Sequence, residues 1–182
     1  FSEARFRSQP WGRPDKGADV ALREVRFAAA SVGVKFDLPR RSVADAAGLV
    51  TAMNELAAAG ARYVLVDAPG DVLRELAAAA VDQELMLFNI SALETNLRRG
   101  NCSRYLFHVI PSRAMLMDGL AQYLVSRKWR KVLVLQGPES GDADLVESFQ
   151  RSAKRFGLKI VDNKPFKLGL DPRQRDRNNV SL

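Results

Sequence analysis

Short apolar segments alternate with helix-like segments along most of this chain of 182 residues. The apolar segments are mostly continuous, so we expect both of their faces to be buried, as in parallel sheets. Helical periodicity fills the intervals, which is the order of elements in α/β proteins. Strands are predicted at 34–38, 63–67, 85–89, 105–110, 131–135 and 158–161. Helices are predicted at 18–32, 71–81, 113–128 and 145–156, and a further helix is predicted to start at Ser42 or Asp45 and to end before Gly60. The chain is therefore predicted to be an α/β protein with a parallel sheet.

Local signals set the expected ends of several helices. Gly33, Gly60 and Gly157 each follow a helical segment, as glycine does in left-handed C-terminal caps. Asp71 is expected to be an N-cap. Asp171 followed by proline is expected to begin a last helix near the end of the chain.

Composition narrows the range of partners. The net charge is +7, but the basic residues are dispersed and not interleaved with aromatic residues, so we expect no nucleic-acid partner. No segment approaches the roughly 18 apolar residues of a membrane span, so we expect no direct membrane insertion. The single cysteine, Cys102, and the single histidine, His108, exclude an internal disulfide and a His/Cys metal cluster. We predict no metal and no cofactor.

The two ends suggest a piece of a longer protein. The chain begins at Phe1 and not at a methionine, and its last residues, 178–182, resemble an element cut in its middle. We therefore expect a fragment.

Ligands of parallel α/β sheets bind at the carboxyl ends of the strands. This rule directs attention to the loops at 67–71, 89–96, 111–113 and 136–142. Ser91 is the most suggestive residue, since it follows a strand and opens a polar turn that we expect to expose backbone N–H groups.

Signatures of catalysis are missing from these loops. There is no Walker loop, no dinucleotide fingerprint and no nucleophile elbow. An α/β enzyme that uses Asp67, Glu94 or Asp142 stays open as an alternative, but we predict that the protein is not an enzyme.

One arrangement of segments resembles a known family. Residues 106–112, the following amphipathic helix and residues 129–135 resemble the lobe crossover of type I periplasmic solute-binding proteins. These include the branched-chain amino-acid binding proteins of ABC transporters. Residues 62–69, 87–92 and 149–161 resemble neighbouring strands and loops of that family, so the likeness spans about 18–161.

A narrower likeness concerns one subgroup. Residues 66–69, 115–124, 134–138, 171–173 and 177–179 resemble the ABC-type substrate-binding proteins associated with PQQ-dependent alcohol oxidation.

The resemblance implies two Rossmann-like lobes that close on a ligand. Residues 1–112 would form lobe 1 without its first strand, 113–129 the crossover helix, and 130–182 the start of lobe 2. The ligand-binding residues would be Asp67, Pro69, Asn89, Ser91, Ala92, Ser112 and Glu139.

The family also implies partners and a compartment. We expect a small-molecule ligand, the membrane permease of an ABC-type importer as partner, and a location in the periplasm. The alternative is a sensory or regulatory ligand-binding domain of the same fold that does not transport.

Some positions depart from the amino-acid binders of the family. Ala68-Pro69-Gly70 stands where those proteins place small hydroxyl residues. His108 replaces a usual arginine, and Arg113 replaces a usual acidic residue. We therefore do not predict leucine as the ligand.

Overall fold

The computed structural model describes residues 14–43, 45–100, 102–138 and 140–166, and the chain divides into two compact units. Unit 1 comprises Phe1–Ala92 and Cys102–Ile110. Unit 2 comprises Leu93–Asn101 and Pro111–Leu182. The assignment of the predicted lobes and crossover helix to parts of the chain remains a prediction.

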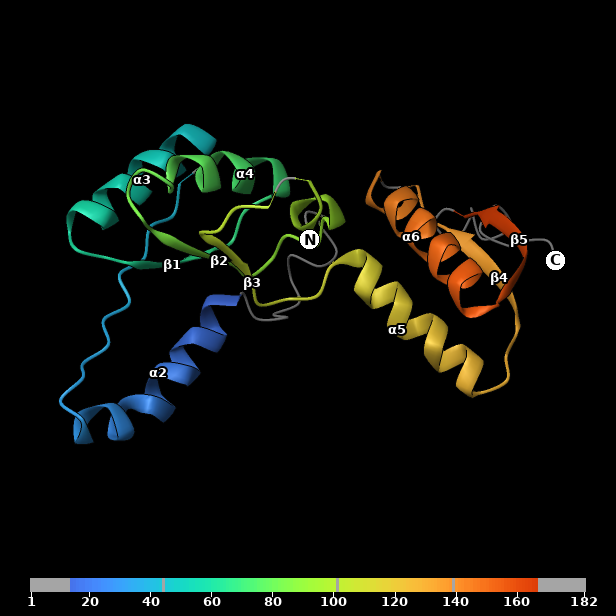
Figure 1. Ribbon diagram of the computed structural model, residues 1–182, viewed down its shortest axis with the longest axis horizontal. Helices are drawn as coiled ribbons and strands as arrows, with labels where there is room; N and C mark the ends of the chain where they lie inside the picture. Colours follow the sequence, from blue (N-terminus) through green and yellow to red (C-terminus); the bar gives the residue numbers. More distant parts are fainter. Residues whose placement is uncertain (1–13, 44, 101, 139, 167–182) are drawn as a thin grey trace, which may run out of the picture. The chain divides into compact units, whose positions relative to one another are not determined.

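Three parallel strands form the sheet of unit 1, in the order β1-β2-β3 (Figure 1). Helices α3 and α4 lie side by side on one face of this sheet (Figure 1). The elements of this unit are α2 (Pro14–Ser31), α3 (Ala46–Ala58), β1 (Tyr63–Val66), α4 (Gly70–Ala79), β2 (Met86–Asn89) and β3 (Leu106–His108).

The core of unit 1 lies between α4 and the sheet. Four leucine side chains are almost completely buried here. Leu73 and Leu76 come from α4, Leu87 comes from β2, and Leu85 directly precedes β2. Burial of such side chains is the main favourable contribution to folding, about 1.5–3 kcal/mol for each.

The other face of this sheet is open among the described residues. Tyr63 and Leu65, which alternate with the inward residues of β1, are 69% and 46% exposed. The prediction that the strands are buried on both faces is therefore wrong for this sheet, since the helices in the described part of the chain cover only one side.

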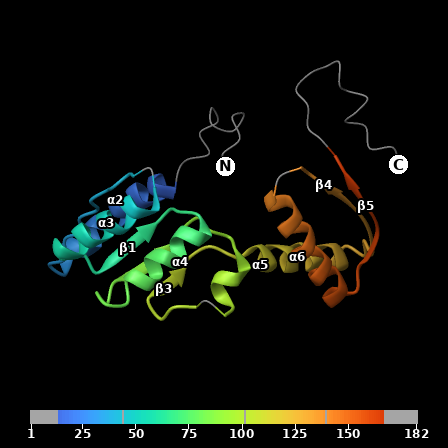
Figure 2. The same ribbon diagram turned by 90° about the horizontal axis from the view of Figure 1, so that it is seen from above.

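Unit 2 combines a pair of parallel strands with two packed helices. Helices α5 and α6 contact each other, and α6 also contacts both strands (Figure 2). Phe149, Ala121, Ala153 and Leu158 form its buried cluster. The elements of this unit are the 3-10 helix η1 (Thr95–Arg98), α5 (Arg113–Ser126), β4 (Lys131–Gln136), α6 (Ser140–Phe156) and β5 (Lys159–Pro165).

The predicted α/β class with parallel sheets is confirmed, and so are five of the predicted strands in shorter or longer form. Gly33, Gly60 and Gly157 all have positive φ, as predicted for the ends of helices. Asp45 caps α3 by accepting a hydrogen bond from the N–H of Gly48 at 2.7 Å.

Three local predictions are wrong. Residues 34–38 are not a strand, because no described strand pairs with them. Helix α2 begins at Pro14 and not at Ala18, which suits proline because the first helical position needs no N–H donor. Asp71 is not the N-cap of α4; Pro69 holds that position, and Asp71 lies in the first turn, where a negative charge favours the helix dipole.

The predicted helix that begins at Asp171 lies outside the described residues. No helix in the described part of the chain is both long enough and apolar enough to span a membrane.

Candidate functional site

The carboxyl ends of the three strands of unit 1 lie level with one another. Val66 of β1 is paired with Asn89 of β2, and Asn89 is paired with His108 of β3. The residues that follow these positions therefore leave the same edge of the sheet, as the sequence predicts for a parallel sheet.

Asn89 organises the turn at this edge. Its side chain is fully buried, and its Oδ1 accepts hydrogen bonds from the N–H groups of Ser91 (3.1 Å) and Ala92 (2.8 Å). Its Nδ2 donates to the carbonyl oxygen of Ala92 at 2.7 Å. The expectation that this turn exposes free N–H groups is wrong for Ser91 and Ala92, because the side chain of Asn89 already binds both.

The second hydrogen atom of the Asn89 amide is directed to His108. The distance from Asn89 Nδ2 to His108 Nδ1 is 2.9 Å. Because an amide NH2 group is only a donor, Nδ1 must be the acceptor, which leaves the proton of the neutral ring on Nε2. His108 is half-buried in β3, and its ring fixes the orientation of the Asn89 side chain.

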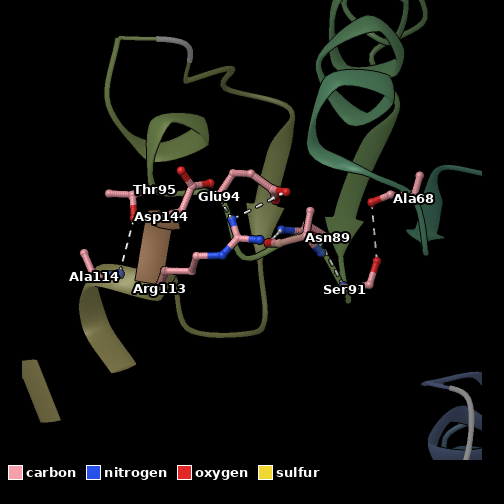
Figure 3. A network of polar contacts seen from close by, with 9 residues as sticks. Ala68, Asn89, Ser91, Glu94, Thr95, Arg113, Ala114 and Asp144 are labelled. Atoms are coloured by element: carbon pink, nitrogen blue, oxygen red, sulfur yellow. Dashed lines mark hydrogen bonds and ion pairs between the residues drawn. The ribbon is translucent and has the colours of Figure 1, made fainter. Parts of the chain in front are cut away.

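Of the predicted binding residues at this edge, Asp67, Pro69 and Ser91 remain accessible. Asp67 and Pro69 are exposed, and Ser91 is half-buried. The hydroxyl of Ser91 is 3.4 Å from the carbonyl oxygen of Ala68 (Figure 3). This distance is longer than the roughly 2.5–3.0 Å of an ordinary O–H···O hydrogen bond, so rotation of the hydroxyl toward another acceptor costs little.

Two of the predicted binding residues belong to the other unit. Ser112 is buried and is the N-cap of α5, where its hydroxyl accepts a hydrogen bond from the N–H of Met115 at 3.3 Å. Glu139 lies outside the described residues.

A group of charged residues in unit 2 surrounds Arg113, at the start of α5. The Nη1 atom of Arg113 lies 3.6 Å from Oε1 of Glu94 and 3.8 Å from Oδ2 of Asp144 (Figure 3). The side chain of Arg113 is only 19% exposed. Arg113 therefore brings together the 93–98 segment and helix α6, which are far apart in the sequence.

The backbone of the same region is fixed by two further bonds. The N–H of Arg113 donates to the carbonyl oxygen of Leu93 at 2.8 Å, and the N–H of Ala114 donates to the Thr95 hydroxyl at 3.3 Å. In the adjacent η1 helix, burial lowers the pKa of the Arg98 guanidinium from its ordinary value, because desolvation disfavours the charged form.

A polar pocket of about 230 Å³ opens beside Arg113. It is lined by Glu94, Thr95, Asn96, Arg113, Asp144, Glu147, Ser148 and Arg151. From the sequence, Glu94 was a possible catalytic residue and Arg113 a replacement for the acidic residue usual in the family. The pocket that joins them was not predicted. Its members come from three segments, and the one local sign was the row of polar residues along one face of α6.

The described residues contain no group of three or more histidine, cysteine or acidic side chains placed to hold a metal ion. Cys102 is exposed and is not part of a disulfide.

Comparisons with known proteins identify the family. A family described as periplasmic binding protein matches residues 14–172, and the chain belongs to this family. No curated protein matches the chain.

Solved structures support the fold. An ABC transporter substrate-binding protein of Desulfitobacterium hafniense in complex with Leu superposes with a TM-score of 0.68 at 20% identity, covering 89% of this chain and 49% of that one. The Leu/Ile/Val/Thr/Ala-binding protein of Brucella ovis gives 0.69 at 17% identity, covering 90% and 45%.

A third structure is a branched-chain amino-acid ABC transporter periplasmic ligand-binding protein of Burkholderia xenovorans, with a TM-score of 0.71 at 14% identity, covering 96% and 46%. The chain spans about half the length of these proteins.

Proposed function

We propose that this chain is part of the solute-binding component of an ABC-type importer, acting in the periplasm and delivering a small molecule to a membrane permease. The observation that carries the proposal is the match to the periplasmic binding protein family over residues 14–172. The solved relatives with this fold are described as substrate-binding proteins of ABC transporters, which gives the transport role its support. In this role the protein binds its solute and does not catalyse a reaction.

We place the ligand at the carboxyl edge of the unit 1 sheet. Asp67, Pro69 and Ser91 are the proposed contact residues in this unit, because they are accessible at the point where the strands end. Asn89 and Ala92 are proposed to act by holding the turn that carries Ser91. Roles for Ser112 and Glu139 rest on the sequence resemblance alone.

The Ser91 hydroxyl and the Asp67 carboxylate favour a ligand with hydroxyl or amide groups. Asp67 forms no hydrogen bond or ion pair within the described part of the chain, so its carboxylate is available as an acceptor. We further propose, from the sequence resemblance at 66–69, 115–124 and 134–138, that the solute belongs to PQQ-dependent alcohol metabolism.

Thermal unfolding of the 182-residue chain in the presence of candidate solutes tests the proposal. The panel contains amino acids, short alcohols and their acids, and PQQ. A ligand at about 100 times its Kd adds about 2.7 kcal/mol of stability. For a chain of this size that corresponds to an increase of about 5–10 °C in Tm.

Variants at the proposed contacts make the test specific. Ser91→Ala and Asp67→Ala should reduce the ligand-induced increase in Tm without changing the Tm of the free protein by more than a few degrees. Asp37→Ala, at an exposed residue outside every predicted loop, is the matched control. An equal ligand response in all three variants would place the ligand elsewhere, and no response to any solute would count against solute binding by this part of the protein.

A further inference from the structure

Helix α5 is apolar on two sides. The side that packs in the core of unit 2 carries Met117, Ala121 and Leu124. A second apolar row has the same i, i+4, i+7 spacing and consists of Leu116, Leu120 and Tyr123, which are all exposed. An ordinary surface helix has a single apolar face, so the exposed row indicates that this side of α5 meets another apolar surface.

Trp129 extends the exposed row beyond the end of the helix. Its ring centre lies 6.4 Å from that of Tyr123, with the two rings nearly perpendicular. The two residues are 54% and 55% exposed. Tryptophan and tyrosine are enriched where a protein meets the interface between lipid headgroups and hydrocarbon, because each combines an apolar ring with a polar atom.

The basic residues of the chain are dispersed, but four of them surround Trp129. This basic segment comprises Arg127, Lys128, Arg130 and Lys131. All four side chains are exposed, and within the described part of the chain none of them forms an ion pair or a side-chain hydrogen bond. The guanidinium of Arg127 lies 5.9 Å from the centre of the Trp129 ring. Unpaired positive charge is therefore adjacent to the exposed aromatic surface.

Lys128 has a backbone conformation that suits glycine better. Its φ is 64°, in the left-handed region that disfavours a residue with a Cβ atom. Gly33 and Gly157 have φ values of 71° and 73° at the ends of their helices. The turn after α5 thus has a lysine where glycine would be more stable, and the lysine adds a positive charge beside Trp129 that the turn itself does not need.

We propose that the exposed row of α5, Trp129 and the basic segment together dock on an anionic lipid bilayer. The apolar side chains enter the headgroup region, and the basic side chains bind the lipid phosphates. A nucleic acid would complement the charges and stack on Trp129, but it would leave Leu116 and Leu120 in water. A bilayer offers hydrocarbon, interface and phosphate together. Docking of this kind keeps α5 in unit 2 and needs no membrane-spanning helix.

Sedimentation of the 182-residue chain with lipid vesicles tests this surface. One set of vesicles contains phosphatidylcholine alone, and the other contains equal parts of phosphatidylcholine and phosphatidylglycerol. We expect binding to the mixed vesicles only, and the binding should weaken as salt is added because salt screens the attraction. In a Trp11→Phe variant Trp129 is the only tryptophan, and its fluorescence should shift to shorter wavelength on binding.

Two variants link the binding to this surface. Lys128→Gly should weaken binding to the mixed vesicles about fivefold, the usual contribution of one basic residue near an anionic membrane, while the Tm stays the same or rises. Lys35→Gly, the same change at an exposed lysine of unit 1, is its control. Leu120→Ala should weaken binding severalfold, and Val25→Ala at an exposed position of α2 is the matched control.

The outcomes are distinct. Binding to the mixed vesicles that weakens in Lys128→Gly and Leu120→Ala, and not in their controls, supports the proposal. It is overturned if the mixed vesicles are not bound, if the neutral vesicles are bound equally well, or if Lys128→Gly binds as tightly as the original chain. Binding to single-stranded poly(U) without binding to vesicles also overturns it, in favour of a nucleic-acid surface. The assay contains no solute, so its result is independent of the solute panel.

Discussion

Replacing Asn89 by alanine should be among the most damaging single changes in unit 1. The side chain is fully buried and forms four hydrogen bonds, two to N–H groups, one to a carbonyl oxygen and one to His108. A typical hydrogen bond contributes about 1 kcal/mol to stability, and a buried group left without a partner costs about 1–3 kcal/mol. Allowing for relaxation of the turn, we expect the free energy of unfolding to fall by roughly 3–5 kcal/mol.

Two measurements check this expectation. Urea unfolding followed by circular dichroism gives the loss of stability. Hydrogen exchange gives the location, because the amides of Ser91 and Ala92 should lose protection, whereas the amide of Ile90, bonded to the carbonyl oxygen of Val66 at 3.2 Å, should retain more of it.

Asn54→Ala is the matched control. Asn54 is an exposed asparagine on α3 whose Oδ1 accepts one hydrogen bond, from Gln83. Its loss should cost about 0.5 kcal/mol or less, as is usual for surface positions. If Asn89→Ala costs no more than this control, or if the amides of Ser91 and Ala92 stay protected, the account of the turn is refuted.

Further predictions concern the core of unit 2 and two of its glycines. Phe149→Ala should lower the free energy of unfolding by about 3–5 kcal/mol, because the ring is 5% exposed in the core, whereas Phe27→Ala, at a ring that is 88% exposed, should change urea unfolding little. Gly157→Ala should destabilise by about 1 kcal/mol, since Gly157 has a φ of 73° that alanine adopts poorly. Gly119→Ala, in the middle of α5 with open space around it, should stabilise by about 0.5–1 kcal/mol, and equal effects of the two glycine changes on Tm would contradict this reasoning.

Local chemistry allowed most of the regular elements to be predicted. The glycine ends of helices and the Asp45 cap depend on a few neighbouring residues, and all are present in the structure. The strand predicted at 34–38 failed because a strand exists only when a neighbour supplies hydrogen bonds, and the sequence of one segment does not reveal its neighbour.

The candidate site was less accessible to sequence reasoning. The positions of Asp67 and Ser91 after strands were predictable from the order of elements. The role of Asn89 was not, because it depends on the register that places His108 beside it. The pocket around Arg113 was not predictable for a similar reason, since its charges come from segments about 50 residues apart, such as Glu94 and Asp144.

The division of the chain into units has a consequence for any attempt to dissect the protein. The polypeptide passes between the units three times, after Ala92, after Asn101 and after Ile110. A cut after Ile110 would therefore leave Leu93–Asn101 attached to unit 1 while removing the N–H groups of Arg113 and Ala114 that bind Leu93 and Thr95. Unit 1 could be freed of unit 2 only by replacing this nine-residue excursion with a short linker as well. Without that replacement, the truncated chain would carry a loop that has lost its hydrogen bonds to Arg113 and Ala114 and that is joined directly to the turn of Asn89. Weak ligand binding by such a truncated chain would then reflect the loss of these bonds, and it would not show that unit 1 lacks a binding site.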